Sequence, residues 1–174
     1  DFTDFYSPSE LGGISLKGTT LNKRTGNEPG RCTETPSGML NCVGLQNPGI
    51  EYFIKEELVR LKTFDTVKIA NVAGAVLDDY EKICERLSDE DIDMVELNIS
   101  CPNVKNGGAA FGTDPKTVEK VTLLSKKMLK NKPLIVKLTP NVSDIKEIAR
   151  AAEAAGADAI SLINTLTGMI IDTK

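Results

Sequence analysis

The sequence predicts an α/β protein built on part of a TIM (β/α)8 barrel, with about five parallel strands and covering helices. Apolar runs alternate with amphipathic segments along the 174 residues, in the order strand, helix, strand, helix. The predicted strands are apolar throughout, which is typical of a parallel sheet whose faces are covered by helices. A doubly wound sheet has the same element order, but polar residues follow almost every predicted strand, and this favours the barrel.

The composition excludes several classes of protein. Hydrophobic residues make up 40% and charged residues 26% of the chain, and the formal net charge is −4. No apolar run approaches the ~20 residues of a membrane span, and no signal-peptide pattern opens the chain. Basic residues are scattered among acidic ones, which argues against nucleic acid as a partner. We therefore expect a cytoplasmic protein that binds neither membranes nor nucleic acid.

Cysteine usage indicates reduced thiols and no metal centre. The cysteines show no Cys-x-x-Cys spacing and the chain has no histidine, so we predict no metal site. A disulfide framework is not expected in a chain of this size with a full core. Cys42, two residues before Gly44, is interpreted as a packing thiol, because buried thiols are usually inert. The four cysteines are Cys32, Cys42, Cys84 and Cys101.

Five short apolar segments predict the strands. Each is bounded by polar or turn-forming residues, as expected of strands in a parallel sheet. The stretch 19–37 is rich in Gly, Pro, Thr and charge, and predicts an extended surface loop. The predicted strands are 13–18, 66–70, 94–99, 133–138 and 157–162.

Amphipathic periodicity and capping residues predict helices between these strands. In the segment 78–87, apolar residues recur at i, i+3, i+4 and i+7, and Cys84 belongs to this face, so we expect it in the core. Asp114 followed by Pro115 predicts a helix start, and Gly156 predicts a helix end. The predicted helices are 50–61, 78–87, 114–129 and 144–155. The core contacts expected from the first helix are Tyr52, Phe53, Leu58 and Val59.

The segment 95–108 has the pattern of a strand followed by a reactive loop. Pro102 ends strand pairing, because proline has no N–H to donate. Gly107 and Gly108 let the following loop turn tightly or swing. Cys101 lies between the strand and this loop, and it is the candidate reactive residue.

Polar side chains at the predicted strand ends form the candidate site. If the strands are parallel, these side chains meet at one face of the barrel. Each alone has a simpler explanation, as a turn residue or a solvated charge, and only their joint occurrence indicates a site. Two cations, several amides and a thiol, without a carboxylate, suit an anionic, amide-rich, planar ligand. The set is Lys17, Asn41, Asn71, Asn98, Cys101, Lys137, Asn164 and Thr165.

Several motifs resemble one enzyme family in the same order along the whole chain. The segment Asn-Ile-Ser-Cys-Pro-Asn at 98–103 closely resembles the active-site loop of class I dihydroorotate dehydrogenases. The segments 39–49 and 103–115 are more similar to the B type, which is NAD-linked and built from two kinds of polypeptide, than to the fumarate-linked A type. The other similar segments are 16–20, 35–41, 44–49, 135–140 and 163–168.

The resemblance implies roles for individual residues. Cys101 would be the catalytic base. The residues implied at the FMN are Lys17, Gly18, Asn71, Asn98, Lys137 and Ile163. The residues implied at the substrate are Lys17, Asn41, Cys42, Val43, Gly44, Leu45, Asn98, Asn103, Asn164 and Thr165.

The resemblance also implies a reaction and a partner. Dihydroorotate would be oxidised to orotate in de novo pyrimidine (UMP) biosynthesis, with Cys101 taking the C5 proton and the hydride passing from C6 to N5 of FMN. Electrons would pass to NAD through a partner subunit that carries FAD and a 2Fe-2S cluster. The B type further implies a homodimer at the core of a heterotetramer.

We expect residues 1–174 to be one incomplete barrel domain that lacks the first and last strands. A closed (β/α)8 barrel takes about 250 residues, and its phosphate-binding loops follow strands seven and eight. Alternatives stay open at this point. They are a fumarate-linked A-type enzyme or a related dihydropyrimidine dehydrogenase, a Schiff-base barrel lyase that uses Lys17 or Lys137, and an inactive half-barrel.

Overall fold

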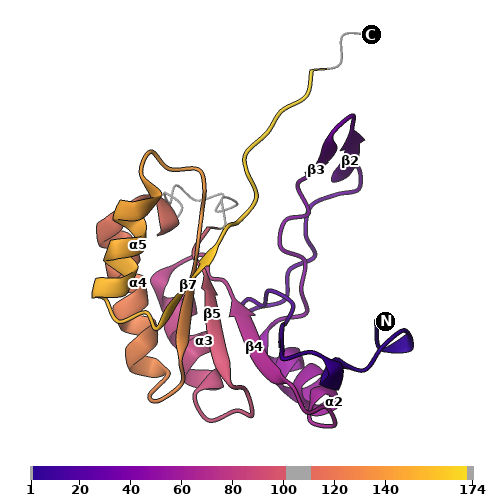
Figure 1. Ribbon diagram of the computed structural model, residues 1–174, viewed down its shortest axis with the longest axis vertical. Coiled ribbons are helices and arrows are strands. Elements are labelled where there is room, and N and C mark those ends of the chain that lie inside the picture. The colour runs from indigo at the N-terminus through magenta and orange to yellow at the C-terminus, as the bar shows by residue number, and fades with distance from the viewer. Residues whose placement is uncertain (1, 101–110, 172–174) are drawn as a thin grey trace.

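The computed structural model describes residues 2–100 and 111–171, which form a five-stranded parallel sheet. The strands lie side by side in the order β1-β4-β5-β6-β7, and the sheet curls as part of a barrel (Figure 1). All four pairings are parallel, which confirms the predicted fold class. The strands are β1 (Gly13–Ser15), β4 (Val67–Val72), β5 (Met94–Asn98), β6 (Leu134–Leu138) and β7 (Ala159–Leu162).

Helices cover the outer face of this sheet. Figure 1 shows α3, α4 and α5 together on one side of the strands. They are α3 (Leu77–Leu87), α4 (Pro115–Met128) and α5 (Ile145–Ala154). A further helix is continuous over α1 (Ile50–Tyr52), the π-helical turn η3 (Phe53–Glu57) and α2 (Leu58–Leu61). Short 3-10 turns are η1 (Phe2–Asp4), η2 (Pro8–Glu10) and η4 (Phe111–Thr113). In the described part of the chain, no helix is both long and apolar enough to cross a membrane.

Capping residues begin and end these helices where the sequence predicts. The Asp114 carboxylate accepts a hydrogen bond from the Thr117 amide, and Asp144 caps α5 in the same way. Each cap satisfies an amide that has no partner within the helix. Gly156 follows α5 with φ +95°, a backbone conformation that favours glycine.

Strand alternation separates an apolar outer face from a polar inner one. On β5, Val95 and Leu97 are fully buried beneath the helices. Glu96 and Asn98 alternate with them and therefore point to the concave side. On β6, Lys137 has this inward position, opposite Asn98 in the register. The core thus lies between sheet and helices, and the concave face carries the polar groups.

Two sequence-based expectations are wrong. The stretch 19–37 is not only loop, because β2 (Cys32–Thr35) pairs with β3 (Gly38–Asn41) as an antiparallel hairpin away from the sheet (Figure 1). Tyr52 and Val59 are about half exposed, at 45% and 54%. The π-helical turn explains this second difference: it shifts the phase of the helix, so that Phe53 and Leu58, five residues apart, both point inward.

Tyr80 of α3 anchors the end of β5. Its ring is fully buried and meets Phe111 edge to face, with ring centroids 5.4 Å apart. Its hydroxyl donates to the backbone oxygen of Asn98 at 2.9 Å. This contact ties a core helix to the residue where the strand reaches the candidate site.

We predict that Tyr80→Phe lowers the free energy of unfolding of the intact protein by about 1–2 kcal/mol, because a buried carbonyl loses a donor. Urea denaturation followed by circular dichroism measures the change. The matched control is Tyr52→Phe on the half-exposed face, which we expect to stay within about 0.5 kcal/mol of the parent. Equal effects of the two substitutions would contradict this role of Tyr80.

Candidate active site

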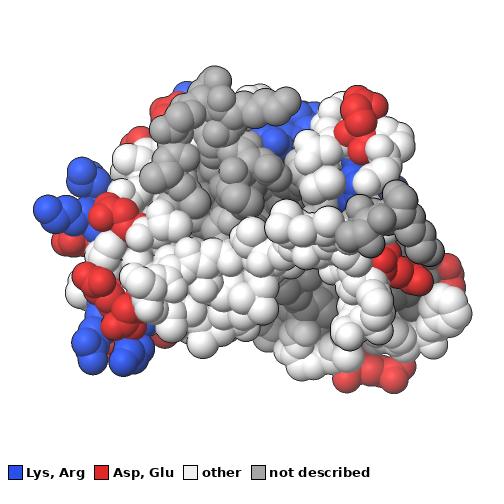
Figure 2. Space-filling model, turned by 90° about the horizontal axis from the view of Figure 1, so that it is seen from above, with Lys and Arg blue, Asp and Glu red and all other residues white. Residues whose placement is uncertain are grey.

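A cavity of about 680 Å³ opens at the carboxyl ends of the parallel strands. Its wall combines Lys17, two residues after β1, with the segment that ends the hairpin, the end of β5 and the loops after β6 and β7. This is the rim on which barrels of this class carry their functional groups. Seen from above in Figure 2, most of the described acidic and basic side chains lie toward the edges of the molecule.

The cavity brings together the described residues predicted to bind the substrate. They come from four separate parts of the chain. The lining includes Lys17, Asn41, Cys42, Val43, Gly44, Leu45, Asn98, Asn164 and Thr165. Cys101 and Asn103, which were also predicted here, lie outside the described residues.

The other described residues predicted for the site lie on, or shortly after, strands of the sheet and outside this cavity. Asn71 is buried on β4, and Lys137 is half-buried on β6. Gly18 follows β1, where a Cβ atom would come within 2.9 Å of the Asn71 side-chain oxygen. Ile163 follows β7 and is 47% exposed. None of these four is part of the cavity wall.

The amides of Asn98 and Asn164 meet directly across the cavity wall. Asn164 Nδ2 donates to Asn98 Oδ1 at 2.9 Å, and the Ser100 amide donates to the same oxygen at 3.3 Å. The Asn164 oxygen accepts from the Thr165 amide at 2.8 Å. Because the Asn98 oxygen is engaged in these bonds, its NH2 group is the half of the amide left to donate to a ligand.

The segment 41–45 is held against the cavity by backbone contacts. The side chain of Asn27 donates through Nδ2 to the Cys42 carbonyl at 2.6 Å, and the backbone N–H of Asn27 donates to the Val43 carbonyl at 3.0 Å. Gly44 has φ +78°, and a Cβ there would lie 2.8 Å from the backbone nitrogen of Asn27. Glycine is therefore required at this turn, both for its conformation and for the close approach.

Asn141 is a cavity residue that the sequence analysis missed. Its Nδ2 donates to the Thr165 carbonyl at 3.1 Å, and its Oδ1 accepts from the Thr167 amide at 3.0 Å. One side chain thus joins the loop after β6 to the loop after β7. The sequence feature that could have indicated Asn141 is the Pro140-Asn141 pair, which follows the predicted strand 133–138 after one residue. The other lining residues that were not predicted are Met39, Leu40, Ser100, Thr113, Thr139, Leu166, Thr167 and Gly168.

One expectation about the site is wrong. Cys42 is exposed in the cavity wall and is not a packing thiol. The inner face also contains a carboxylate that the sequence analysis did not consider, Glu96, which is 9% exposed in the middle of β5 and is not one of the strand-end groups. Its signal was alternation: a residue two positions before Asn98 in a strand points to the same face.

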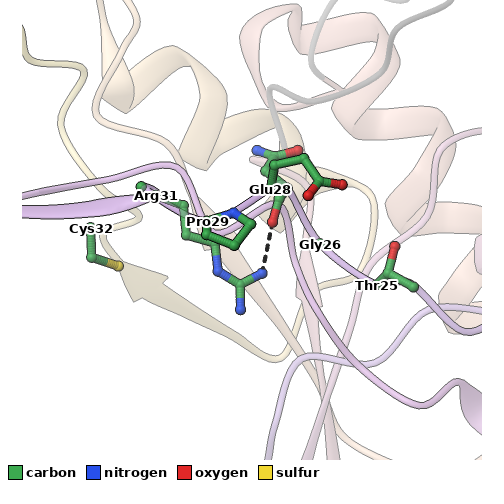
Figure 3. A pocket seen from close by; sticks show the side chains of 8 residues that line it. Thr25, Gly26, Glu28, Pro29, Arg31 and Cys32 are labelled. Atoms are coloured by element: carbon green, nitrogen blue, oxygen red, sulfur yellow. Dashed lines mark hydrogen bonds between the residues drawn. The ribbon is translucent and has the colours of Figure 1, made fainter.

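A second hollow lies beside the hairpin and lacks the predicted residues. It is formed by residues 25–32, which lead into β2 (Figure 3). The guanidinium of Arg31 donates to the Asn27 carbonyl at 3.0 Å and to Gln46 Oε1 at 2.5 Å. The cation therefore stabilises the loop, and none of the predicted site residues lines this hollow.

A family model described as dihydroorotate dehydrogenase matches residues 1–174. The chain belongs to the dihydroorotate dehydrogenase family. Three similar proteins are each named dihydroorotate dehydrogenase B (NAD(+)), catalytic subunit. They are from Brachyspira hyodysenteriae (53% identical over 175 residues), Alkaliphilus oremlandii (56% over 172) and Bacteroides thetaiotaomicron (54% over 175).

These matches confirm the predicted resemblance to B-type dihydroorotate dehydrogenases. They cover 99–100% of this chain but 57% of each relative. The chain therefore spans just over half the length of the dihydroorotate dehydrogenases that it matches. The five-stranded curled sheet agrees with this extent, since a closed barrel of the class has eight strands.

We predict that the thiols differ sharply in reactivity. Burial raises the pKa of Cys84 to about 12, whereas Cys32 and Cys42 are exposed. Iodoacetamide at pH 8, followed by peptide mass spectrometry, should modify Cys42 and Cys32 in the folded protein. Cys84 should react roughly a thousandfold more slowly, because only the thiolate is nucleophilic. Modification of Cys84 as fast as Cys42, without denaturant, would contradict the described burial.

Proposed function

We propose that the intact protein oxidises dihydroorotate to orotate in de novo pyrimidine biosynthesis in the cytoplasm, with FMN as its bound cofactor. One observation carries the proposal. The described residues that the family motifs assign to the substrate line a single cavity at the ends of parallel strands. Family membership and the names of the relatives give independent support.

The cavity wall suits a small planar anion with amide groups. Lys17 supplies a positive charge for a carboxylate, and Asn98 has an NH2 group to offer to a ring carbonyl. Orotate and dihydroorotate combine one carboxylate with a ring of amide-like groups. The proposed substrate residues are Lys17, Asn41, Cys42, Val43, Gly44, Leu45, Asn98, Asn103, Asn164 and Thr165.

Residues beside the cavity fit a flat cofactor. At Gly18 a side chain would collide with Asn71 Oδ1, so glycine lets the Asn71 amide lie close to the backbone of this turn. Lys137 provides a cation on the same face, suited to negative charge that develops on a reduced ring. Bound FMN would supply the acceptor for the hydride from C6 of the substrate. The proposed FMN residues are Lys17, Gly18, Asn71, Asn98, Lys137 and Ile163.

Cys101 is proposed as the base that removes the proton from C5 of dihydroorotate. It follows Ser100, which lines the cavity. A free thiol has a pKa of about 8.5, so it can act as a base near neutral pH, and we propose that the cation of Lys17 favours the thiolate. Loss of the C5 proton and the C6 hydride leaves the C5–C6 double bond of orotate. The surrounding amides hold the ring so that both transfers occur from one orientation.

The relatives are named as catalytic subunits of NAD-linked enzymes, and this supports a partner subunit. We propose that the partner carries FAD and a 2Fe-2S cluster and passes electrons to NAD. A homodimer of the catalytic chain would form the core of the resulting heterotetramer.

We predict that the intact protein has a flavin absorption spectrum and that dihydroorotate bleaches it without air. Cys101→Ser should retain the flavin but slow its bleaching by about 10²–10⁴-fold, because the proton acceptor is lost. Stopped-flow absorbance at about 450 nm, where an oxidised flavin absorbs, measures both rates. Cys32→Ser, on the hairpin strand β2 and outside the cavity lining, is the matched control and should behave as the parent.

Two outcomes would count against the proposal. Overlaying traces for Cys101→Ser and the parent would remove Cys101 from the mechanism. A colourless protein whose lysine is trapped by borohydride with a carbonyl substrate would instead support a Schiff-base lyase.

A further inference from the structure

Glu96 joins three strands on the inner face of the sheet. Its Oε1 accepts a hydrogen bond from Ser161 Oγ at 2.7 Å, and its Oε2 accepts one from Ser15 Oγ at 3.4 Å. The side-chain nitrogen of Asn71 also donates to Oε2. Ser15 and Ser161 belong to β1 and β7, the two edge strands of the described sheet, while Glu96 lies on the central one. A buried carboxylate is costly unless it is hydrogen-bonded, and this one is bonded through both oxygens.

This contact fixes the orientation of the Asn71 amide. A carboxylate only accepts hydrogen bonds, so it selects the NH2 side of the amide and turns the oxygen away. That oxygen points toward Gly18, since a Cβ built there would lie 2.9 Å from it. Gly18 in turn follows Lys17, which lines the cavity. Asn71 therefore turns its acceptor oxygen toward the Lys17–Gly18 turn beside the cavity.

We propose that Glu96 is a positioning residue: it holds Asn71 so that the amide oxygen accepts a hydrogen bond from a ring N–H of a planar heterocycle. The inference rests on the proposed function, in which this heterocycle is the flavin of FMN. The serines, by contrast, brace the carboxylate from the strands on either side. Removing a serine hydroxyl takes one hydrogen bond from the Glu96 carboxylate. Changing Asn71 or Glu96, in contrast, alters which atom of residue 71 faces the ligand.

The test exchanges the amide of Asn71 and the carboxylate of Glu96 between the two positions in the intact protein. Asn71→Asp places a second carboxylate against Glu96, and FMN affinity should fall about ten- to a hundredfold. In the double variant Asn71→Asp with Glu96→Gln, the glutamine NH2 donates to the aspartate, which again offers an oxygen beside Gly18. We expect FMN affinity to return to within about threefold of the parent, and the visible bands of the bound flavin to recover with it.

Ser161→Ala is the matched control, because it removes a donor to Glu96 without changing Asn71. It should lower the unfolding temperature of the apoprotein but leave FMN affinity within about twofold. FMN affinity is measured by quenching of free flavin fluorescence, and stability by thermal unfolding without FMN. Thermal unfolding without FMN reports on the hydrogen bonds of Glu96 independently of the cofactor.

The outcomes separate this inference from the proposed function. Rescue of both stability and affinity in the double variant supports the inference. A parent that binds FMN, with all variants binding equally well or with Ser161→Ala as weak as Asn71→Asp, overturns the positioning role alone. A parent that binds no FMN overturns both this inference and the proposed function.

Discussion

Parallel pairing of β1, β4, β5, β6 and β7 places the carboxyl ends of all five strands of this sheet on one rim. The rest of the site depends on this constraint. Each strand ends at a different point in the sequence, yet the polar residues that follow are brought to the same side. The helices that cover the outer face bury the alternate residues of every central strand and so hold the register. A slip of one residue would turn Asn98 and Lys137 into the core.

Hydrogen bonds within the inner face then decide what each amide offers. Asn164 engages the oxygen of Asn98 and leaves its NH2 group, whereas Glu96 engages the NH2 group of Asn71 and leaves its oxygen. A donor and an acceptor are thus fixed on neighbouring strands before any ligand binds. Asn141 adds rigidity by joining two loops of the rim. Pre-organised polar groups of this kind lower the entropic cost of orienting a substrate.

Local patterns predicted most of the regular structure, because strand and helix lengths, caps and apolar periodicity act over few residues. The Asp114 cap, the Gly156 stop and the buried Cys84 are confirmed. The hairpin β2–β3 was missed because its strands lie outside the parallel sheet and are largely exposed, so they lack an apolar signature. The site was predicted from strand ends and family motifs. Alternation places Glu96 on the inner face, but its role was missed because the donors that bind it are more than twenty residues away in the sequence.

The most direct measurement is a crystal structure of the intact protein with orotate. It tests whether the strand-end side chains converge on one ligand. We expect orotate in the cavity, in contact with Lys17, Asn98 and Asn164, with the sulfur of Cys101 about 3–3.5 Å from C5. Orotate bound away from these three residues, or a Cys101 sulfur turned away from the ring, would contradict the account.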